Sequence, residues 1–186
     1  MIQTSQTTET LPRTLEEFIA WEPTDGFKYE WNDGEIIQFT GMQKEQVYIY
    51  DRLIELFFEL GYNKTGTLIA EQNVHLSGIQ LRRPDICYLT RAQVNQNARG
   101  ADTTPAFAIE VISKHDKMDQ LEQKLTEYFQ AGVQVVWLIV PKRQVVHVYT
   151  SRRKVTICLG SDICSAAPVL PDFEIQVDAL LALPEE

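Results

Sequence analysis

Apolar residues recur at helical spacing in two long stretches of the chain, which predicts two helices that each bury one face. The first spans about residues 45–60, and its apolar stripe consists of Val47, Tyr50, Ile54 and Phe57. The second begins at Ser113–Asp116 and ends before Gly132, and its stripe consists of Met118, Leu121, Leu125 and Tyr128. A shorter helix is predicted at the start of the chain, where Thr14 and Glu17 form a capping box.

Short runs of apolar, β-branched and aromatic residues predict strands between and after these helices. The predicted strands are 67–76, 86–89, 107–112 and 135–140. Asp33-Gly34 lies between two such runs and predicts a hairpin, and a second hairpin is predicted over 144–150 and 155–159. The polar stretch 90–105 is rich in turn residues and predicts a surface loop with at most a helical turn.

The order of these elements predicts an α/β fold. From residue 45 it is helix, three strands, helix, strand, which indicates a core in which helices flank a mixed β-sheet. An N-terminal helix and hairpin and a C-terminal hairpin are added to this αβββαβ core. The length fits one domain, so we expect a disordered lead-in over residues 1–12 and a single domain over residues 13–186.

Composition excludes several classes of protein. No apolar run approaches the ~20 residues that span a membrane, and the polar N-terminus lacks a signal-peptide pattern, so we expect a cytoplasmic protein with no membrane partner. The three cysteines match no zinc spacing and are predicted to be packing residues. The net charge of −9 disfavours a nucleic-acid partner overall, although Arg82, Arg83, Lys114 and Lys117 place basic groups near two unusual acids.

Those acids are Asp85 and Glu110, which stand on apolar segments that are predicted to be buried strands. An acid in such a position is costly unless it is paired. Mg²⁺ and Mn²⁺ prefer oxygen ligands, so the two carboxylates and the backbone carbonyl of Val111 predict a divalent-metal site. The alternative interpretation is that both are structural acids paired with Arg82 or Arg83.

Several longer motifs extend this pattern over roughly residues 14–183. They are YEWNDGEII, RRPDICYL, AIEVIS, DQLEQKLTEYFQAGVQVVWLIVP and VLPDFEI. Together they resemble the Uma-two (DUF820) family of restriction-endonuclease-like proteins, within the PD-(D/E)XK nuclease superfamily. The resemblance implies a restriction-endonuclease-like fold, a bound Mg²⁺ or Mn²⁺, and hydrolysis of DNA phosphodiester bonds by a metal-activated water.

The chain departs from the superfamily pattern two residues after the glutamate, where Ile112 replaces the usual lysine. The resemblance implies that Lys124 supplies the amine instead. Without the resemblance and the two acids, the sequence would favour a plain surface lysine on an amphipathic helix. The spacing agrees, because a helix that returns over the sheet carries Lys124 ~12 Å from its start, back toward Glu110. The implied catalytic residues are Asp85, Glu110 and Lys124. Lys114 and Lys117 are expected to contact phosphate.

Two further candidates are Tyr128, which can donate a hydrogen bond in the site, and Glu35, which can approach the metal through water. The equal alternative for Tyr128 is a core tyrosine. Glu30 also matches a family position, but Glu30 and Glu35 are interpreted first as exposed strand residues. A second departure is Gln46, where the family often has a histidine. These departures and the acidic charge leave open an alternative function, a catalytically decayed nuclease-fold protein that acts as a binding or assembly module. A homodimer is compatible with duplex cutting.

Overall fold

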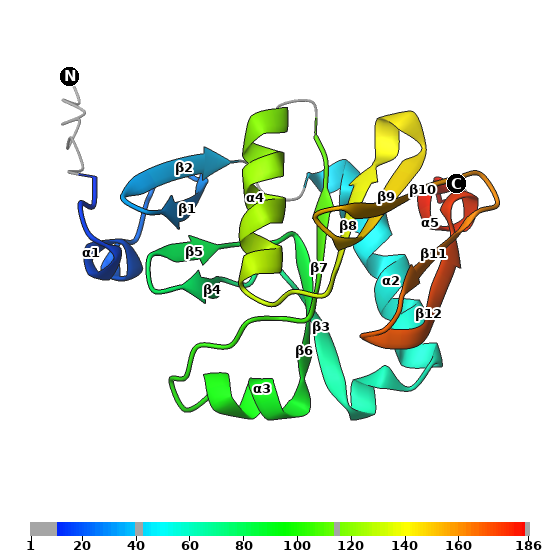
Figure 1. Cartoon of the computed structure of the whole chain (residues 1–186), viewed down its shortest axis with the longest axis horizontal. Helices are drawn as coiled ribbons and strands as arrows, with labels where there is room; N and C mark the ends of the chain where they lie inside the picture. Colours follow the sequence, from blue (N-terminus) through cyan, green and yellow to red (C-terminus); the bar gives the residue numbers. More distant parts are fainter. Residues whose placement is uncertain (1–10, 40–42, 114–115, 185–186) are drawn as a thin grey trace, which may run out of the picture.

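The computed structural model describes residues 11–39, 43–113 and 116–184, and its central feature is a six-stranded sheet (Figure 1). The strand order is β10-β9-β8-β7-β6-β3. β7 and β8 run parallel, whereas the other neighbours run antiparallel, so the sheet is mixed as expected. Its strands are β3 (Gly66–Ala70), β6 (Ile86–Thr90), β7 (Phe107–Val111), β8 (Val135–Val140), β9 (Val145–Ser151) and β10 (Lys154–Leu159).

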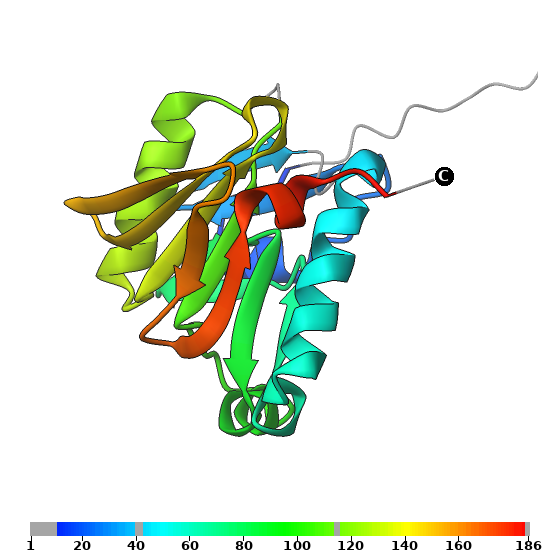
Figure 2. The same ribbon diagram turned by 90° about the vertical axis from the view of Figure 1, so that its right-hand side faces the viewer.

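Helices cover both faces of this sheet, and Figure 2 shows the strands between them. α2 (Val47–Glu59) buries Phe57 against one face. α4 (Met118–Gln130) connects β7 to β8 and buries Leu125 and Tyr128 against the other. Successive strand residues point to opposite faces, so the near-continuous apolar runs of β7 and β8 supply two separate cores.

A smaller sheet lies beside α4, with the strand order β2-β1-β5-β4 (Figure 1). Its strands are β1 (Lys28–Asn32), β2 (Glu35–Phe39), β4 (Val74–Ser77) and β5 (Gln80–Arg82). The short helix α1 (Leu15–Ala20) packs Phe18 against Trp31 and Leu81 on one face of this sheet. Asp33 and Gly34 join β1 to β2 with positive φ angles of 47° and 89°, which confirms the predicted hairpin.

The end of the chain completes the core on the α2 side. The two-stranded sheet of β11 (Ile163–Ala166) and β12 (Leu170–Gln176) and the helix α5 (Val177–Leu181) contribute buried residues to the α2 cluster. The β9–β10 hairpin also has its predicted location. Short 3₁₀ turns are η1 (Lys44–Gln46), η2 (Tyr62–Lys64) and η3 (Pro141–Arg143).

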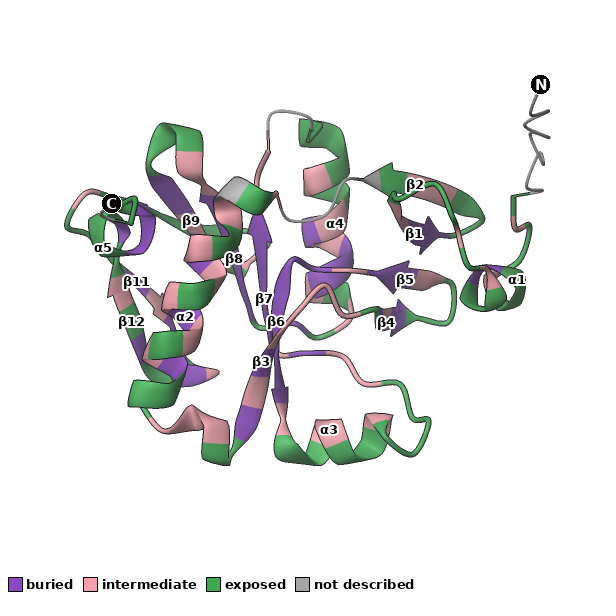
Figure 3. Cartoon of the chain, turned by 180° about the vertical axis from the view of Figure 1, so that it is seen from behind, coloured by how far each residue is buried: buried purple, intermediate pink, exposed green. Residues whose placement is uncertain are grey.

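Two sequence predictions were wrong in detail. The single strand predicted over 67–76 is two strands in different sheets, because the chain turns at Glu71, whose φ is 50°. The polar stretch after β6 holds a full helix, α3 (Arg91–Asn97), begun by a capping box between Thr90 and Gln93. Figure 3 shows α3 with exposed and intermediate residues and no buried one, in line with the absence of an apolar stripe from its sequence.

One residue of a predicted apolar stripe is exposed, and two further predictions concern residues outside the described ranges. Met118, assigned to the apolar stripe of α4, is 69% exposed at the first position of that helix. Residues 1–10 of the predicted lead-in, and Lys114, lie outside the described residues. Among the residues that the structure describes, no helix has both the length and the apolar character needed to cross a membrane.

Candidate active site

The two acids singled out in the sequence face each other across neighbouring strands. β6 pairs with β7 through Ile86 and Ile109, and continuing that antiparallel register by one position sets Asp85 opposite Glu110. The backbone N–H of Val111 donates a 2.6 Å hydrogen bond to Asp85 Oδ2, which ties the two segments together. Both acids therefore lie on the face of the sheet that α4 covers.

Lys124 reaches the same point from α4. Its Nζ lies 2.9 Å and 3.0 Å from the two carboxylate oxygens of Glu110, and its side chain is only 14% exposed. Tyr128, one helical turn later, donates its hydroxyl to Glu110 Oε1 at 2.5 Å. The loop after β7 and the return of α4 thus bring together Asp85, Glu110, Lys124 and Tyr128.

Glu30 belongs to this cluster, so its interpretation as an exposed strand residue was wrong. It is 4% exposed, and its Oε1 lies 2.8 Å from Lys124 Nζ. Its Oε2 accepts from Arg82 Nη1 at 3.0 Å, and its Oε1 also accepts from the backbone N–H of Arg83 at 2.8 Å. By contrast, Glu35 is exposed at the first position of β2.

Arg82 extends the buried network to a residue that the sequence did not single out. Its Nε donates to Glu127 Oε2 at 2.6 Å, and Glu127 is 4% exposed on α4. The sequence left open the alternative that Asp85 and Glu110 are structural acids that form ion pairs with Arg82 or Arg83. Arg82 instead pairs with Glu30 and Glu127, and Arg83 Nε donates to Asn73 Oδ1.

The cluster carries an excess of negative charge. Four buried carboxylates face two cations, so two negative charges remain when all six groups are ionised. The carboxylates are Glu30, Asp85, Glu110 and Glu127, and the cations are Arg82 and Lys124. Burial, which outweighs attraction to Lys124, raises the pKa of Asp85 to about 6 and that of Glu110 to about 8.

Glu30 behaves differently from these two acids. Burial would raise its pKa, but the charges of Lys124 and Arg82 oppose burial and hold the pKa below its ordinary value. Burial also works against the ammonium of Lys124, yet the charges of Glu110 and Glu30 raise the Lys124 pKa above its ordinary value. Lys124 therefore stays positively charged. Asp85 and Glu110 are the two acids of the cluster whose pKa values are raised, so they are the ones that hold protons near neutral pH.

These groups border an open cleft of about 320 Å³, whose lining includes Asp85, Glu110, Lys124 and the basic residue Lys117. Within the described ranges, no set of three or more His, Cys, Asp or Glu residues is arranged as a metal cage. Asp85 and Glu110 are two of the carboxylates that line the cleft. With the excess charge of two, this pair matches how Mg²⁺ is often held, by one or two carboxylates plus water and substrate oxygens. The donor set therefore fits a hard divalent cation.

The fold and this cleft define a mixed α/β protein with several sheets and a buried acid–lysine cluster. Residues 15–178 match the Uma2 family model, described as "Putative restriction endonuclease", and the chain belongs to that family. This confirms the resemblance seen in the motifs.

A crystal structure of a putative nuclease belonging to DUF820 from Anabaena variabilis is similar in fold. The TM-score is 0.74 at 20% sequence identity, over 91% of this chain and 98% of that one. A search of curated proteins finds no match.

Proposed function

We propose that this protein is a metal-dependent DNA endonuclease that hydrolyses phosphodiester bonds, with DNA as its partner. The observation that carries the proposal is the meeting of Asp85, Glu110 and Lys124 in one open cleft. The path α2, β3, β6, β7, α4, β8 follows the αβββαβ order of a restriction-endonuclease-like core. Membership of the Uma2 family supports the same reaction class.

Asp85 and Glu110 would hold the ion, Mg²⁺ or Mn²⁺, and the carbonyl of Val111 is the predicted third ligand. When bound, such an ion lowers the pKa of a coordinated water and offsets charge on the phosphate. The Val111 N–H orients Asp85 through its 2.6 Å hydrogen bond, and the Tyr128 hydroxyl orients Glu110 through a hydrogen bond of 2.5 Å. The two carboxylates are therefore positioned before the ion arrives.

Ile112 occupies the position two residues after Glu110 where the superfamily usually has lysine, and in this proposal Lys124 supplies the amine instead. Ile112 packs at the edge of the apolar cluster under α4, so the strand position itself is apolar. Lys124 Nζ contacts Glu110 from the helix, where it can orient the attacking water or stabilise charge that develops on the phosphate. Glu30 holds Lys124 from the other side and is a positioning residue.

Cleavage of DNA by the purified protein tests this assignment. We expect turnover with Mg²⁺ or Mn²⁺ that stops on chelation. Asp85→Asn, Glu110→Gln and Lys124→Met should each lower the rate by at least about 100-fold, because each removes a group that contacts the metal or the reacting phosphate. Asp172→Asn and Lys154→Met change exposed residues of β12 and β10 and serve as matched controls.

Unchanged cutting by the three site variants would refute the assignment. Absence of metal binding by calorimetry, together with absence of hydrolysis with any divalent ion, would instead favour the alternative function, a decayed nuclease that binds or assembles. That alternative stays motivated by Ile112 and by the net charge of −9. A homodimer remains a prediction, and sedimentation of the full chain with and without DNA tests it.

A further inference from the structure

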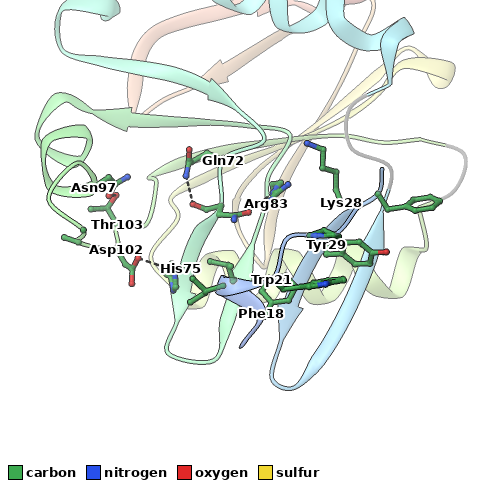
Figure 4. A pocket seen from close by; sticks show the side chains of 17 residues that line it. Phe18, Trp21, Lys28, Tyr29, Gln72, His75, Arg83, Asn97, Asp102 and Thr103 are labelled. Atoms are coloured by element: carbon green, nitrogen blue, oxygen red, sulfur yellow. Dashed lines mark hydrogen bonds and ion pairs between the residues drawn. The ribbon is translucent and has the colours of Figure 1, made fainter. Parts of the chain in front are cut away.

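A second cleft lies on the opposite face of the four-stranded sheet from Glu30 and Arg82 (Figure 4). It has a volume of about 320 Å³ and is bordered by α1, that sheet and the segment 97–103. Tyr29 and Leu81 line it, and each is one strand position away from an active-site residue. Because neighbouring strand residues point to opposite faces, β1 and β5 present the acid–lysine cluster on one side and this cleft on the other.

The two clefts meet at the end of the small sheet. Phe27 and Arg83 line both of them. Arg83 is two residues before Asp85, its backbone N–H is bonded to Glu30, and its guanidinium donates to Asn73 in the second cleft. A ligand that extends from Asp85 into the second cleft therefore passes Arg83, whose charge suits a phosphate.

One wall of the second cleft is aromatic. The rings of Trp21 and Tyr29 are 4.7 Å apart at 54°, and Phe18 lies 6.0 Å from Trp21. Trp21 Nε1 is buried and has no hydrogen-bond partner among the described residues, and the indole packs against the apolar cluster of Phe18, Trp31 and Leu81. Such partly exposed aromatic rings are the surfaces on which unpaired bases stack.

The opposite wall is polar. Gln72 and Asn73 line it with carboxamides, which both donate and accept, and Figure 4 shows Gln72 across the cleft from the rings of Phe18, Trp21 and Tyr29. His75 Nε2 lies 3.2 Å from Asp102 Oδ1 at the other end. A flat ligand with both donors and acceptors on its edge would stack on one wall and form hydrogen bonds with the other.

We propose that this second cleft binds one unstacked nucleobase of a DNA strand, with the adjoining phosphate at Arg83 and the next phosphodiester at Asp85 and Glu110. The substrate class is then DNA with a single-stranded or flipped nucleotide beside the cut. The volume lies at the small end of ligand sites, which suits one nucleoside unit and excludes a stacked duplex. The placement of the scissile bond rests on the proposed nuclease function, whereas base binding does not.

Intrinsic fluorescence of the full chain tests base binding directly. The protein has three tryptophans, and Trp31 and Trp137 are 4% and 0% exposed, so quenching by a bound base reports on Trp21. A single-stranded oligonucleotide is titrated in the presence of a chelator, which keeps it uncut. We expect quenching of Trp21 and tighter binding of the single strand than of a blunt duplex of the same sequence.

Trp21→Leu and Tyr29→Leu keep apolar volume next to α1 but remove a stacking ring. Each should weaken binding of the single strand by roughly 5- to 100-fold, measured by anisotropy of a labelled oligonucleotide. Phe58→Leu removes an exposed ring on α2 and should leave the affinity unchanged. Near-ultraviolet circular dichroism confirms that each variant is folded.

The outcomes separate the two proposals. Wild-type affinity in both folded variants, or equal binding of single strand and duplex without quenching, overturns the base cleft even if the protein cuts DNA. Quenching that is lost in Tyr29→Leu, with weaker anisotropy binding of the single strand in both variants, supports the cleft even if no cleavage is found, in which case the nuclease assignment alone fails.

Discussion

At the scale of single residues, Asp85 and Glu110 retain their protons more tightly than ordinary carboxyl groups, which couples metal binding to pH. Their pKa values, about 6 and about 8, are raised, so both are largely protonated in acid and must lose protons to bind a cation. Affinity for Mn²⁺ should therefore rise strongly from about pH 5.5 to about pH 8.5, with proton release.

Calorimetry at both pH values, in buffers of different ionisation enthalpy, measures the affinity and the protons released. In Glu110→Gln one of the titrating ligands is gone, so the affinity should be low and its pH dependence shallower. Equal wild-type affinities at the two pH values would contradict the assignment of these two acids as ligands.

Residue chemistry was also where sequence reasoning succeeded and failed most clearly. Asp85 and Glu110 were found because a carboxylate in an apolar strand is conspicuous. Glu30 lies between Tyr29 and Trp31, an alternation typical of a strand with one wet face. That face is dry only because α4 covers it, and no local pattern in β1 encodes the position of a helix some 90 residues later.

At the scale of elements, Arg82 on β5 forms buried ion pairs with Glu30 on β1 and with Glu127 on α4, and so links the small sheet to the helix. Arg82→Met leaves two buried carboxylates without this counter-charge and should lower the free energy of unfolding by about 3–5 kcal/mol. The matched control is Arg152→Met, which removes an exposed pair with Glu122 on the same helix and should cost less than about 1 kcal/mol. Urea denaturation measures both, and equal losses would contradict the structural role given to the buried pair.

The elements themselves were predictable where turn chemistry and periodicity agreed, as in α2, the Asp33-Gly34 hairpin and the unit α4–β8. The strand predicted over 67–76 failed because apolar residues resume at Val74 after the polar run that begins at Glu71, and the pattern does not say that the second run joins another sheet. α3 was missed because an exposed helix needs only a cap and no apolar stripe. Both errors come from tertiary placement rather than local preference.

At the scale of the whole molecule, the candidate site is a junction of three layers. The six-stranded sheet supplies Glu110, the small sheet supplies Glu30 and Arg82, and α4 lies between them with Lys124. A cation that binds Asp85 and Glu110 at this junction relieves the excess charge of all three layers together. Its effect on stability should therefore extend to the whole domain and not to one loop.

Thermal unfolding tests this coupling and the single-domain prediction for residues 13–186. A ligand that binds only the folded state at about 100 times its Kd adds about 2.7 kcal/mol. For a chain of this size that shift raises the Tm by roughly 5–11 °C. We expect Mn²⁺ to move one cooperative transition, seen alike in far- and near-ultraviolet circular dichroism, and to leave Asp85→Asn unmoved. Two transitions, of which only one responds to the ion, would mean that the small sheet folds apart from the six-stranded sheet and that the junction does not couple them.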